Sequence, residues 1–313
     1  MVMRFDDKIY IAGRGGMVGA SIERSLRKRG YNNIIGLRSS EIDLREQHLV
    51  SRYFVQERPD IVVLAAAKVG GIQANIKSPA EFLYDNLMIQ NNVIHNAYRT
   101  GVRKLLFLGS SCIYPRESPQ PMKEEYLLDG KLEPTNEGYA IAKIAGIKLC
   151  ETYNKQYHTE FISVMPCNIY GIGDNIDPKQ SHVVAGLMRK LHEAKVYNKP
   201  SVEVWGTGKA RRELMFSEDL GDACYALLEG YSGNKFINIG TGEDISIKDL
   251  SFLIRHVVGY EGEIRFNPNM PDGMPQKLLD VSRLKDFGWE YQTSLKEGLE
   301  MMYQWFIEQV NHS

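Results

Sequence analysis

Three side chains in the sequence are of the types that transfer protons at a carbonyl group. Tyr139 and Lys143 stand four residues apart in "YAIAK", so a helix would place both on one face. Ser110 lies in "KLLFLGSS" (104–111), where we expect a strand to end. A lysine ammonium beside a tyrosine stabilises the phenolate and lowers a pKa that is ordinarily about 10. Such pairs also occur by chance on exposed helix faces, but the serine and the glycine loop favour hydride chemistry at a carbonyl.

The glycine loop "GRGGMVG" (13–19) follows a short apolar segment and opens a segment of helical character. Gly13 permits a tight turn, Gly16 lets the backbone approach a pyrophosphate, and Gly19 lets helix and strand pack closely. The N-terminus of the helix would face the anion. Glycines at this spacing also occur in ordinary turns, but the strand-turn-helix context predicts a dinucleotide site.

The end of the second expected strand, "GLRSS" (36–40), bears on the choice of nicotinamide cofactor. NAD-selective sites place Asp or Glu there to hold the ribose 2′-hydroxyl. This chain has Arg38 at that point and Arg14 in the glycine loop. A guanidinium can bind a 2′-phosphate with two hydrogen bonds, whereas a carboxylate would repel it. We therefore expect NADP rather than NAD; the alternative is that both arginines are solvated surface charges.

Apolar segments and helix-length segments alternate along the first half of the chain. Each apolar segment is continuous, as strands covered on both faces require. The alternation predicts an α/β fold with a doubly wound parallel sheet of the Rossmann type, whose ligands bind at the carboxyl ends of its strands. The expected strands are residues 8–13, 33–37, 60–67, 104–111 and 160–166, and the clearest helices are residues 16–29, 79–100 and 137–156.

The alternation becomes less regular after residue 166, where Gly, Asp and Asn are frequent and the apolar segments shorten. We expect a cofactor-binding Rossmann domain of residues 1–172 plus 213–240. Residues 173–212 plus 241–313 would form a smaller α/β substrate lobe. The chain would then return to the main sheet within residues 213–240, and the site would lie in the cleft between the lobes.

The charges of the chain are nearly balanced, with 38 Lys and Arg against 39 Asp and Glu. No general basic field therefore draws nucleic acid or an anionic membrane to the protein. The start of the chain has no apolar signal-peptide segment, and no run of 18 apolar residues occurs, so we expect a soluble cytoplasmic protein. The four cysteines form no CxxC pair or zinc-type cluster, so we expect free thiols and no metal.

Five segments together resemble the extended short-chain dehydrogenase/reductases and, within them, the GDP-L-fucose synthase family. They are the glycine loop, "LAAAKVGGIQAN", "GSSCIYP", "YAIAKIAG" and "MPCNIYG", and "SHVV", "VWGTG", "RRELMF" and "PDGMPQKLLDVSRL" extend the resemblance over essentially the whole chain. The "AAAKVGGI" and "SSCIYP" segments are the distinctive ones. The resemblance implies a homodimer, NADPH, and a two-stage reaction on GDP-4-keto-6-deoxy-D-mannose, in which epimerisation at C3 and C5 precedes reduction at C4.

The resemblance also gives roles to Cys112 and His182. Related sugar-nucleotide dehydratases carry an acid at the position of Cys112, and a thiol there suits epimerisation instead. The 4-keto group acidifies the C3 and C5 hydrogens, and a thiol of pKa about 8.5 is partly thiolate at neutral pH, more so beside a cation. His182 would return the protons from the opposite face. Considered alone, Cys112 would be a small buried hydrophobe and His182 a surface residue.

Further roles follow from the same resemblance. Ser110 and Tyr139 would hydrogen-bond the C4 oxygen, Tyr139 would give its proton, and Lys143 would lower the tyrosine pKa and hold the nicotinamide ribose. The implied cofactor contacts are Gly13, Arg14, Gly16, Met17, Val18, Gly19, Arg38, Asp43, Leu44, Ala65, Ala67, Tyr139, Lys143, Pro166 and Asn168. The implied substrate contacts are Lys190, Trp205, Arg212, Asn168 and Lys277, with Arg212 at the diphosphate.

Two departures from the family pattern keep alternatives open. Gly15 stands where the family loop usually has an arginine, and Lys190 replaces a usual arginine. The substrate could therefore be a GDP-4-keto-heptose for a surface polysaccharide, reduced at C4 without epimerisation in this enzyme. A protein that senses NADP without catalysis is an alternative of another class, although Ser110, Tyr139 and Lys143 are all present.

Overall fold

The computed structural model describes residues 3–177, 181–270 and 272–311. Its main sheet has six parallel strands in the order β2-β1-β3-β4-β5-β9. They are β1 (Ile9–Ala12), β2 (Ile34–Ile35), β3 (Ile61–Leu64), β4 (Lys104–Leu108), β5 (Glu160–Pro166) and β9 (Ile237–Ile239). Every residue of β1, β3 and β4 is buried, which explains why these segments are continuously apolar or nearly so. The predicted doubly wound parallel sheet is confirmed.

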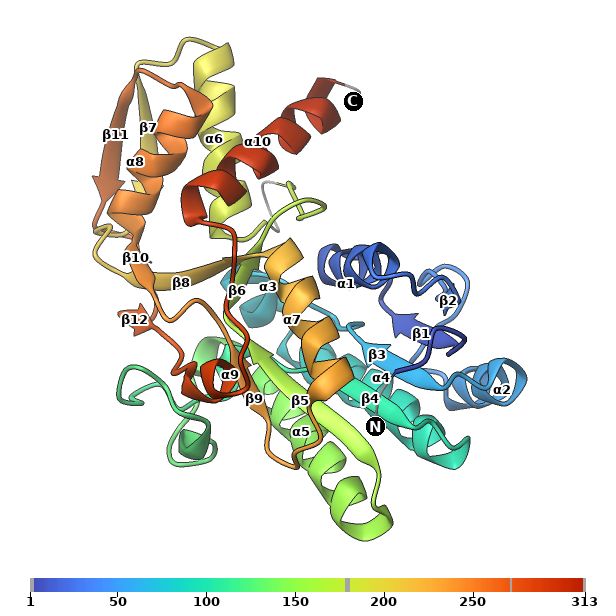
Figure 1. The fold of residues 1–313 in the computed structure, drawn as a ribbon. Helices are drawn as coiled ribbons and strands as arrows, with labels where there is room; N and C mark the ends of the chain where they lie inside the picture. Colours follow the sequence, from blue (N-terminus) through green and yellow to red (C-terminus); the bar gives the residue numbers. More distant parts are fainter. Residues whose placement is uncertain (1–2, 178–180, 271, 312–313) are drawn as a thin grey trace.

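Helices cover both faces of this sheet (Figure 1). On one face α1 (Met17–Lys28) packs against α7 (Ser217–Gly230). On the other face α4 (Pro79–Arg99) contacts both α2 (Gln47–Glu57) and α5 (Glu137–Tyr157). The short helix α3 (Ile72–Lys77) precedes α4. The carboxyl ends of the strands therefore meet at one edge, where the glycine loop and the segment after β4 lie.

A smaller lobe is built around β8 (Arg211–Phe216), which pairs with three short strands. They are β6 (Asn168–Tyr170) and β12 (Gln276–Lys277), both parallel to β8, and β10 (Asp244–Ser246), which is antiparallel to it. A second pair is formed by β7 (Ser201–Trp205) and β11 (Glu263–Asn267). The helices of this lobe are α6 (Val183–Val196), α8 (Ile247–Val258) and α10 (Leu295–Asn311), and α9 (Ser282–Asp286) lies beside β9 (Figure 1).

Two apolar cores follow this division, and the later chain contributes to both. Leu214 and Phe216 of β8 pack in the core of the smaller lobe, whereas Met215 between them packs in the core of the main sheet. Within the expected return at 213–240, β9 joins the main sheet, but β8 does not. Residues beyond 240, among them Leu284 and Trp289, also pack in the main-sheet core. The exact domain boundaries stay a prediction.

Candidate active site

The glycine loop leaves no room for side chains at two of its positions. Gly13 has φ +87°, and a Cβ there would lie 2.6 Å from the main-chain nitrogen of Ala66. A Cβ on Gly19 would lie 2.2 Å from the oxygen of Gly13. The first turn of α1, which begins at Met17, has no acidic residue and no side-chain cap. Its free N–H groups fit an anion such as a dinucleotide pyrophosphate.

Loops from three elements surround the start of α1. The predicted contacts Met17 and Val18 form its first turn, and a Cβ on Gly173 would lie 3.6 Å from the Cα of Met17. Ala65 follows β3 and donates its N–H to the oxygen of Ala12 at 2.9 Å, and Ala67 stands two residues later. The segments after β3 and around Gly173 therefore lie close to the glycine loop and the start of α1.

The two arginines predicted to select NADP differ in their surroundings. Arg14 forms an ion pair with Glu23 of α1, in which its Nη2 atom lies 2.7 Å from Oε1. The guanidinium of Arg38 is exposed, and no hydrogen bond or ion pair holds it among the described residues. Arg38 is therefore more available than Arg14 to bind a 2′-phosphate, because the Arg14 guanidinium is already paired with Glu23.

Two further predicted cofactor positions, Asp43 and Leu44, lie in the loop between β2 and α2. Asp43 pairs with Arg45 at 2.7 Å, which lowers the pKa of the Asp43 carboxyl. The main-chain oxygen of Leu44 accepts a hydrogen bond from Asn92 of α4 at 2.9 Å. The loop is thus held in place by its own contacts, and the carboxylate of Asp43 is already partnered.

The segment that carries Ser110 and Cys112 turns sharply out of β4. A Cβ on Gly109 would lie 2.3 Å from the end of the Met165 side chain and 3.1 Å from the main-chain oxygen of Val164, so a larger residue would displace Met165. Ser110 caps the 3-10 turn η1 (Ser111–Ile113), with its Oγ accepting the N–H of Cys112 at 3.4 Å. Cys112 is 6% exposed but belongs to neither apolar core, whereas the other three cysteines all lie in the core of the main sheet. Ser110, Lys277 and Lys143 interact with the thiol, and these polar neighbours favour a role beyond packing.

Tyr139 and Lys143 occupy neighbouring turns of α5, as their spacing predicted. The Nζ atom of Lys143 is buried and donates to the oxygen of Leu108 at 2.8 Å, and it lies 5.7 Å from the centre of the Tyr139 ring. The Tyr139 ring packs edge-on against Phe82 of α4. The helix thus brings phenol and ammonium to the carboxyl end of β4, beside Ser110.

Burial dominates the ionisation of this cluster. It raises the pKa of Tyr139 well above its ordinary value, and the charge of Cys112 raises it further, while Ser110 opposes the rise. We expected a lowered pKa for this phenol, and that expectation is wrong for this structure because burial disfavours the phenolate. Burial also lowers the pKa of Lys143 to about 8.

Burial likewise raises the pKa of the Cys112 thiol, although several neighbours favour its thiolate form. The largest opposing effect comes from the ammonium of Lys277, followed by the hydrogen bond to Ser110 and the charge of Lys143. Two cationic neighbours therefore favour the thiolate, and the effect of Lys277 is the stronger.

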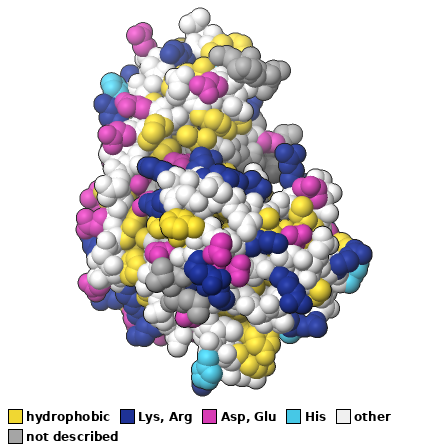
Figure 2. Space-filling model, turned by 45° about the vertical axis from the view of Figure 1, so that its right-hand side comes forward, with side chains coloured by type: hydrophobic (Ala, Val, Ile, Leu, Met, Phe, Trp, Pro, Cys, Tyr) yellow, Lys and Arg dark blue, Asp and Glu magenta, His cyan; other side chains and the backbone are white. Residues whose placement is uncertain are grey.

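Arg212, predicted at the diphosphate, and Lys277, predicted as a substrate contact, are opposite each other on β8 and β12. Arg212 donates to the oxygen of Met274 at 2.7 Å, and burial lowers its pKa. Burial also lowers the pKa of Lys277, whose ammonium has no hydrogen bond among the described residues. Figure 2 shows Lys and Arg side chains gathered where the two lobes meet on one face. Among the described residues no ion pair joins either cation to a carboxylate, and two half-buried cations of this kind suit a diphosphate.

Other predicted substrate positions are less clearly connected to this cluster. Asn168 follows Pro166 at the end of β5, and its amide donates to the oxygen of Glu213 at 3.0 Å. Lys190 is exposed and donates to the oxygen of Glu203 at 2.9 Å. Trp205 is 53% exposed. Within the described ranges, no hydrogen bond or ion pair joins Lys190 or Trp205 to Cys112 or Tyr139.

His182 precedes α6 and is exposed. A Cβ on Gly71 would lie 3.9 Å from the oxygen of Ser181, so this segment lies beside the loop that follows β3. His182 also interacts with Asp174, whose pKa is raised by burial and lowered in part by the histidine. Among the described residues no hydrogen bond or ion pair joins His182 to Cys112. Its role as the second proton-transfer residue stays a prediction.

A cavity of about 250 Å³ opens beside Tyr139, between α3, α4 and the start of α5. Asn75 and Asn136 line it, and each has a buried Oδ1 atom without a hydrogen-bond partner. Neither asparagine is among the predicted site residues, although Asn75 ends "LAAAKVGGIQAN", one of the segments that carry the family resemblance. Two unpartnered acceptors beside the phenol indicate that this cavity can hold a polar ligand.

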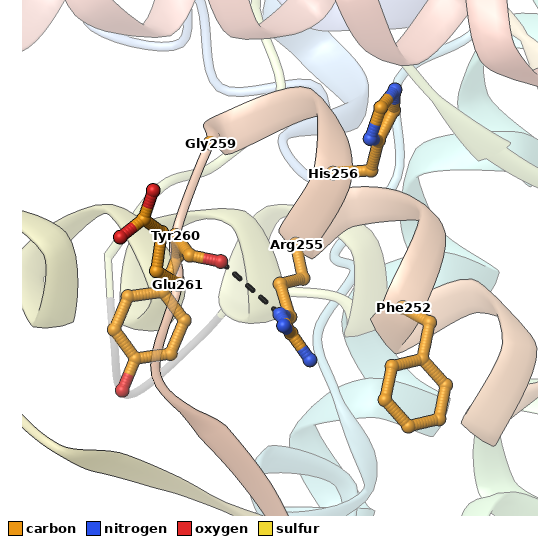
Figure 3. A pocket seen from close by; sticks show the side chains of 6 residues that line it. All are labelled: Phe252, Arg255, His256, Gly259, Tyr260 and Glu261. Carbon is orange, nitrogen blue, oxygen red and sulfur yellow. Dashed lines mark hydrogen bonds between the residues drawn. The ribbon is translucent and has the colours of Figure 1, made fainter.

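A second cavity of about 320 Å³ lies on the outer lobe, at the end of α8. Figure 3 shows Arg255 reaching the main-chain oxygen of Tyr260, at 3.1 Å, while His256 turns away from it. Phe252 lies one turn earlier on the helix. None of the predicted catalytic or binding residues lines this cavity.

Within the described ranges, no group of three or more His, Cys, Asp or Glu side chains could hold a metal ion. No helix in the same part of the chain is both long enough and apolar enough to span a bilayer.

The fold and the Ser, Tyr and Lys cluster define a dinucleotide-dependent enzyme of carbonyl chemistry. A family model described as the NAD dependent epimerase/dehydratase family matches residues 9–240. The chain belongs to this family, and the resemblance noted in the sequence is confirmed.

Relatives of known name are similar to this chain over its whole length. GDP-L-fucose synthase 1 of Arabidopsis thaliana is 51% identical over 303 residues, which are 97% of this chain and 94% of the relative. GDP-L-fucose synthase of Escherichia coli (strain K12) is 49% identical over 310 residues, which are 96% of this chain and 97% of the relative. A solved structure of a GDP-mannoheptose C4 reductase from Campylobacter jejuni with NADP bound has a TM-score of 0.89 at 39% identity, covering 97% of this chain and 99% of that chain.

Proposed function

We propose that this protein converts GDP-4-keto-6-deoxy-D-mannose to GDP-L-fucose, by epimerisation at C3 and C5 and NADPH-dependent reduction at C4. The observation that carries the proposal is the position of Cys112. The thiol is buried outside both apolar cores, beside the Ser110 hydroxyl and under the influence of Lys277 and Lys143. The names of the full-length relatives point to the same reaction.

In the epimerisation, Cys112 takes a proton from C3 and later from C5, and His182 returns a proton to the opposite face of each carbon. The ketone makes both hydrogens acidic because the resulting carbanion is stabilised as an enolate. Ser110 and Tyr139 donate hydrogen bonds to the enolate oxygen at C4. The raised pKa of Tyr139 keeps the phenol protonated at neutral pH, so it remains a donor throughout this stage.

In the reduction, Tyr139 gives its proton to the C4 oxygen. Bound NADPH supplies the hydride to C4. The ammonium of Lys143 stabilises the resulting phenolate, and its hydrogen bond to Leu108 fixes its position. A phenol with a raised pKa is in the protonated state that reduction requires.

Residues of the Rossmann domain would hold NADPH. The main-chain cradle at Gly13 and Gly19 and the uncapped start of α1 fit the pyrophosphate. Arg38 would meet the 2′-phosphate, and Met17, Val18, Asp43, Leu44, Ala65, Ala67 and Pro166 would line the remaining length. Arg212 and Lys277 would hold the substrate diphosphate, with Lys190, Trp205 and Asn168 around the GDP-sugar.

A second candidate is the C4 reduction of a GDP-4-keto-heptose without epimerisation. The solved GDP-mannoheptose C4 reductase, whose chain this structure covers almost completely, favours it. Both reactions need Ser110, Tyr139 and Lys143, but only epimerisation needs the Cys112 thiolate. The retained thiol and its two cationic neighbours therefore favour the first candidate.

One experiment distinguishes the candidates. Protein, NADPH and GDP-4-keto-6-deoxymannose are incubated in deuterated water, and the label is followed by NMR. Deuterium at both C3 and C5 of the reduced product is expected. Reduction without deuterium at these carbons would favour the heptose reductase. Tight NADPH binding without turnover of either substrate would favour a non-catalytic NADP sensor.

We further propose that the protein is a cytoplasmic homodimer that pairs through α4 and α5. The two helices pack together and expose Tyr84, Ile141 and Tyr157. These apolar side chains would be buried against a second copy across a two-fold axis. One chain has a mass of 35.6 kDa, and light scattering at micromolar concentration is expected to give twice this value. A monomer under these conditions would contradict this proposal.

A further inference from the structure

Glu213 is a buried carboxylate that has no role in the reaction described above. It lies in β8 next to Arg212 and is 1% exposed. Its Oε1 atom accepts the N–H of Gly242 at 2.8 Å, and its Oε2 atom accepts the N–H of Leu279 at 2.8 Å. Each carboxylate oxygen therefore binds a different segment of backbone.

The two segments adjoin β10 and β12, the strands that pair with β8 on either side. Gly242 lies just before β10, and Leu279 lies two residues after Lys277 of β12. Arg212 and Lys277 are paired positions on β8 and β12. The Glu213 side chain thus ties the strand that carries Arg212 to the strand that carries Lys277.

The surroundings leave the carboxylate little freedom to move. A Cβ on Gly240 would lie 2.1 Å from Oε1, so even a methyl group there would displace it. The main-chain oxygen of Glu213 accepts the Asn168 amide at 3.0 Å. Glu213 therefore lies where β6, β8, β12 and the turn after β9 meet, at the boundary between the two lobes.

A carboxylate at this position has an energetic cost that a neutral side chain would avoid. Burial raises the pKa of Glu213 to about 7, and hydrogen bonds from Gly242 and Leu279 only partly oppose it. A glutamine would fit the space, but it has one acceptor oxygen and its NH₂ group would face one of the two N–H donors. Only the carboxylate gives both backbone segments an acceptor. Fixing the alignment of these segments is a reason to keep a charged group in a buried position.

We propose that Glu213 is a positioning residue that sets the spacing of Arg212 and Lys277, so that the two cations can grip the diphosphate of a GDP-sugar together. This inference rests on the proposed function for its ligand. Glu213 itself does not touch the substrate. Its effect is on affinity for the nucleotide and not on proton or hydride transfer.

Asp219 offers a matched control elsewhere in the molecule. It is 5% exposed, and its two carboxylate oxygens accept the N–H groups of Gln292 and Thr293 at 3.2 and 3.1 Å. Burial raises its pKa as well. Asp219→Asn therefore also removes one acceptor from a buried carboxylate. It lies in the first turn of α7, whereas Arg212 and Lys277 lie on β8 and β12.

The test measures binding of GDP and of NADPH to the full chain by calorimetry. Glu213→Gln is expected to weaken GDP binding by about tenfold or more, the size of one lost interaction. NADPH binding should stay within about twofold, and Asp219→Asn should leave both ligands within about twofold. Unchanged GDP binding in Glu213→Gln, or an equal loss for both ligands, would overturn the proposal.

A measurement on the wild-type protein keeps the proposal testable even if the Glu213→Gln variant does not fold. GDP binding is expected to slow hydrogen exchange at the amides of Gly242 and Leu279, because the gripped cations restrain both segments. No added protection at either amide would also overturn the proposal. Turnover of a GDP-4-keto sugar by the wild type tests the proposed function separately. A chain that binds GDP but never turns over such a sugar would refute the activity and leave the positioning role intact.

Discussion

The Nζ atom of Lys143 donates a hydrogen bond to the main-chain oxygen of Leu108, at a distance of 2.8 Å. This bond joins α5 to the carboxyl end of β4, two residues before Ser110. The ammonium is buried, and its pKa is lowered to about 8 because burial disfavours its charged form. The charge that we propose to support the Tyr139 phenolate is therefore one that can be lost within the working pH range.

Reduction at C4 is expected to slow as the pH rises through about 8. Above this pH Lys143 becomes neutral, the phenolate loses its support, and kcat should fall by about tenfold for each further pH unit. The measurement is the pH dependence of kcat with a pre-epimerised ketone as substrate. Lys143→Met should be slow at every pH and lack this decline, and an identical decline in the variant would contradict the assignment.

The same group predicts the direction of a stability change. The unfolded-state pKa of lysine, about 10.5, lies above the folded value, so the unfolded chain binds more protons between pH 8 and 10.5. The contribution of Lys143 to the free energy of unfolding should therefore increase with pH over this range. Urea denaturation at pH 8 and pH 10 should show a larger increase for the wild type than for Lys143→Met, and equal increases would contradict it.

Cys112→Ser is expected to impair proton exchange at C3 and C5 by about 100-fold or more, since a serine hydroxyl is a far weaker acid than a thiol. Reduction of a pre-epimerised ketone should change by less than about threefold. Exchange is followed by NMR in deuterated water and reduction by NADPH absorbance. Cys167→Ser is the control, because that thiol lies in the main-sheet core. Equal loss of both steps in Cys112→Ser would refute the division of roles.

Most of the fold could be predicted because it depends on short-range patterns. The strands at residues 104–111 and 160–166 were recognisable from continuous apolar sequence, and the helices at 79–100 and 137–156 from their length. The structure places them within a few residues of those bounds. The pairing of Tyr139 with Lys143 was likewise predictable, because helical spacing alone puts them on adjacent turns.

What the sequence did not reveal depends on contacts between distant segments. Arg14 pairs with Glu23, nine residues away, because α1 turns that carboxylate toward the loop. Burial raises the pKa of Tyr139, and the degree of burial is set by packing against Phe82 of another helix. The bonds of Glu213 to Gly242 and Leu279 span the seam between lobes. None of these relationships has a signature in local sequence.

Arg38→Gln is expected to weaken NADPH binding by about tenfold or more while leaving NADH binding within about twofold, because only NADPH carries a 2′-phosphate. Arg14→Gln is the matched control, since Glu23 already holds the Arg14 guanidinium. Fluorescence titration with both cofactors provides the measurement. A greater loss of NADPH affinity in Arg14→Gln than in Arg38→Gln would reverse the assignment of the two arginines.

Two neighbouring glycines of the cofactor loop offer a paired test of its geometry. Gly13 has φ +87°, and a Cβ there would lie 2.6 Å from the nitrogen of Ala66, whereas a Cβ on Gly15 would meet nothing within 4 Å. The left-handed conformation alone costs about 1–2 kcal/mol for alanine, and the contact forces the loop away from β3. Gly13→Ala should therefore lower the melting temperature and weaken NADPH binding by about tenfold or more, and Gly15→Ala should do neither. The readouts are thermal denaturation without ligand and NADPH titration. If both variants bind NADPH like the wild type, the glycine loop is not the cradle of the pyrophosphate.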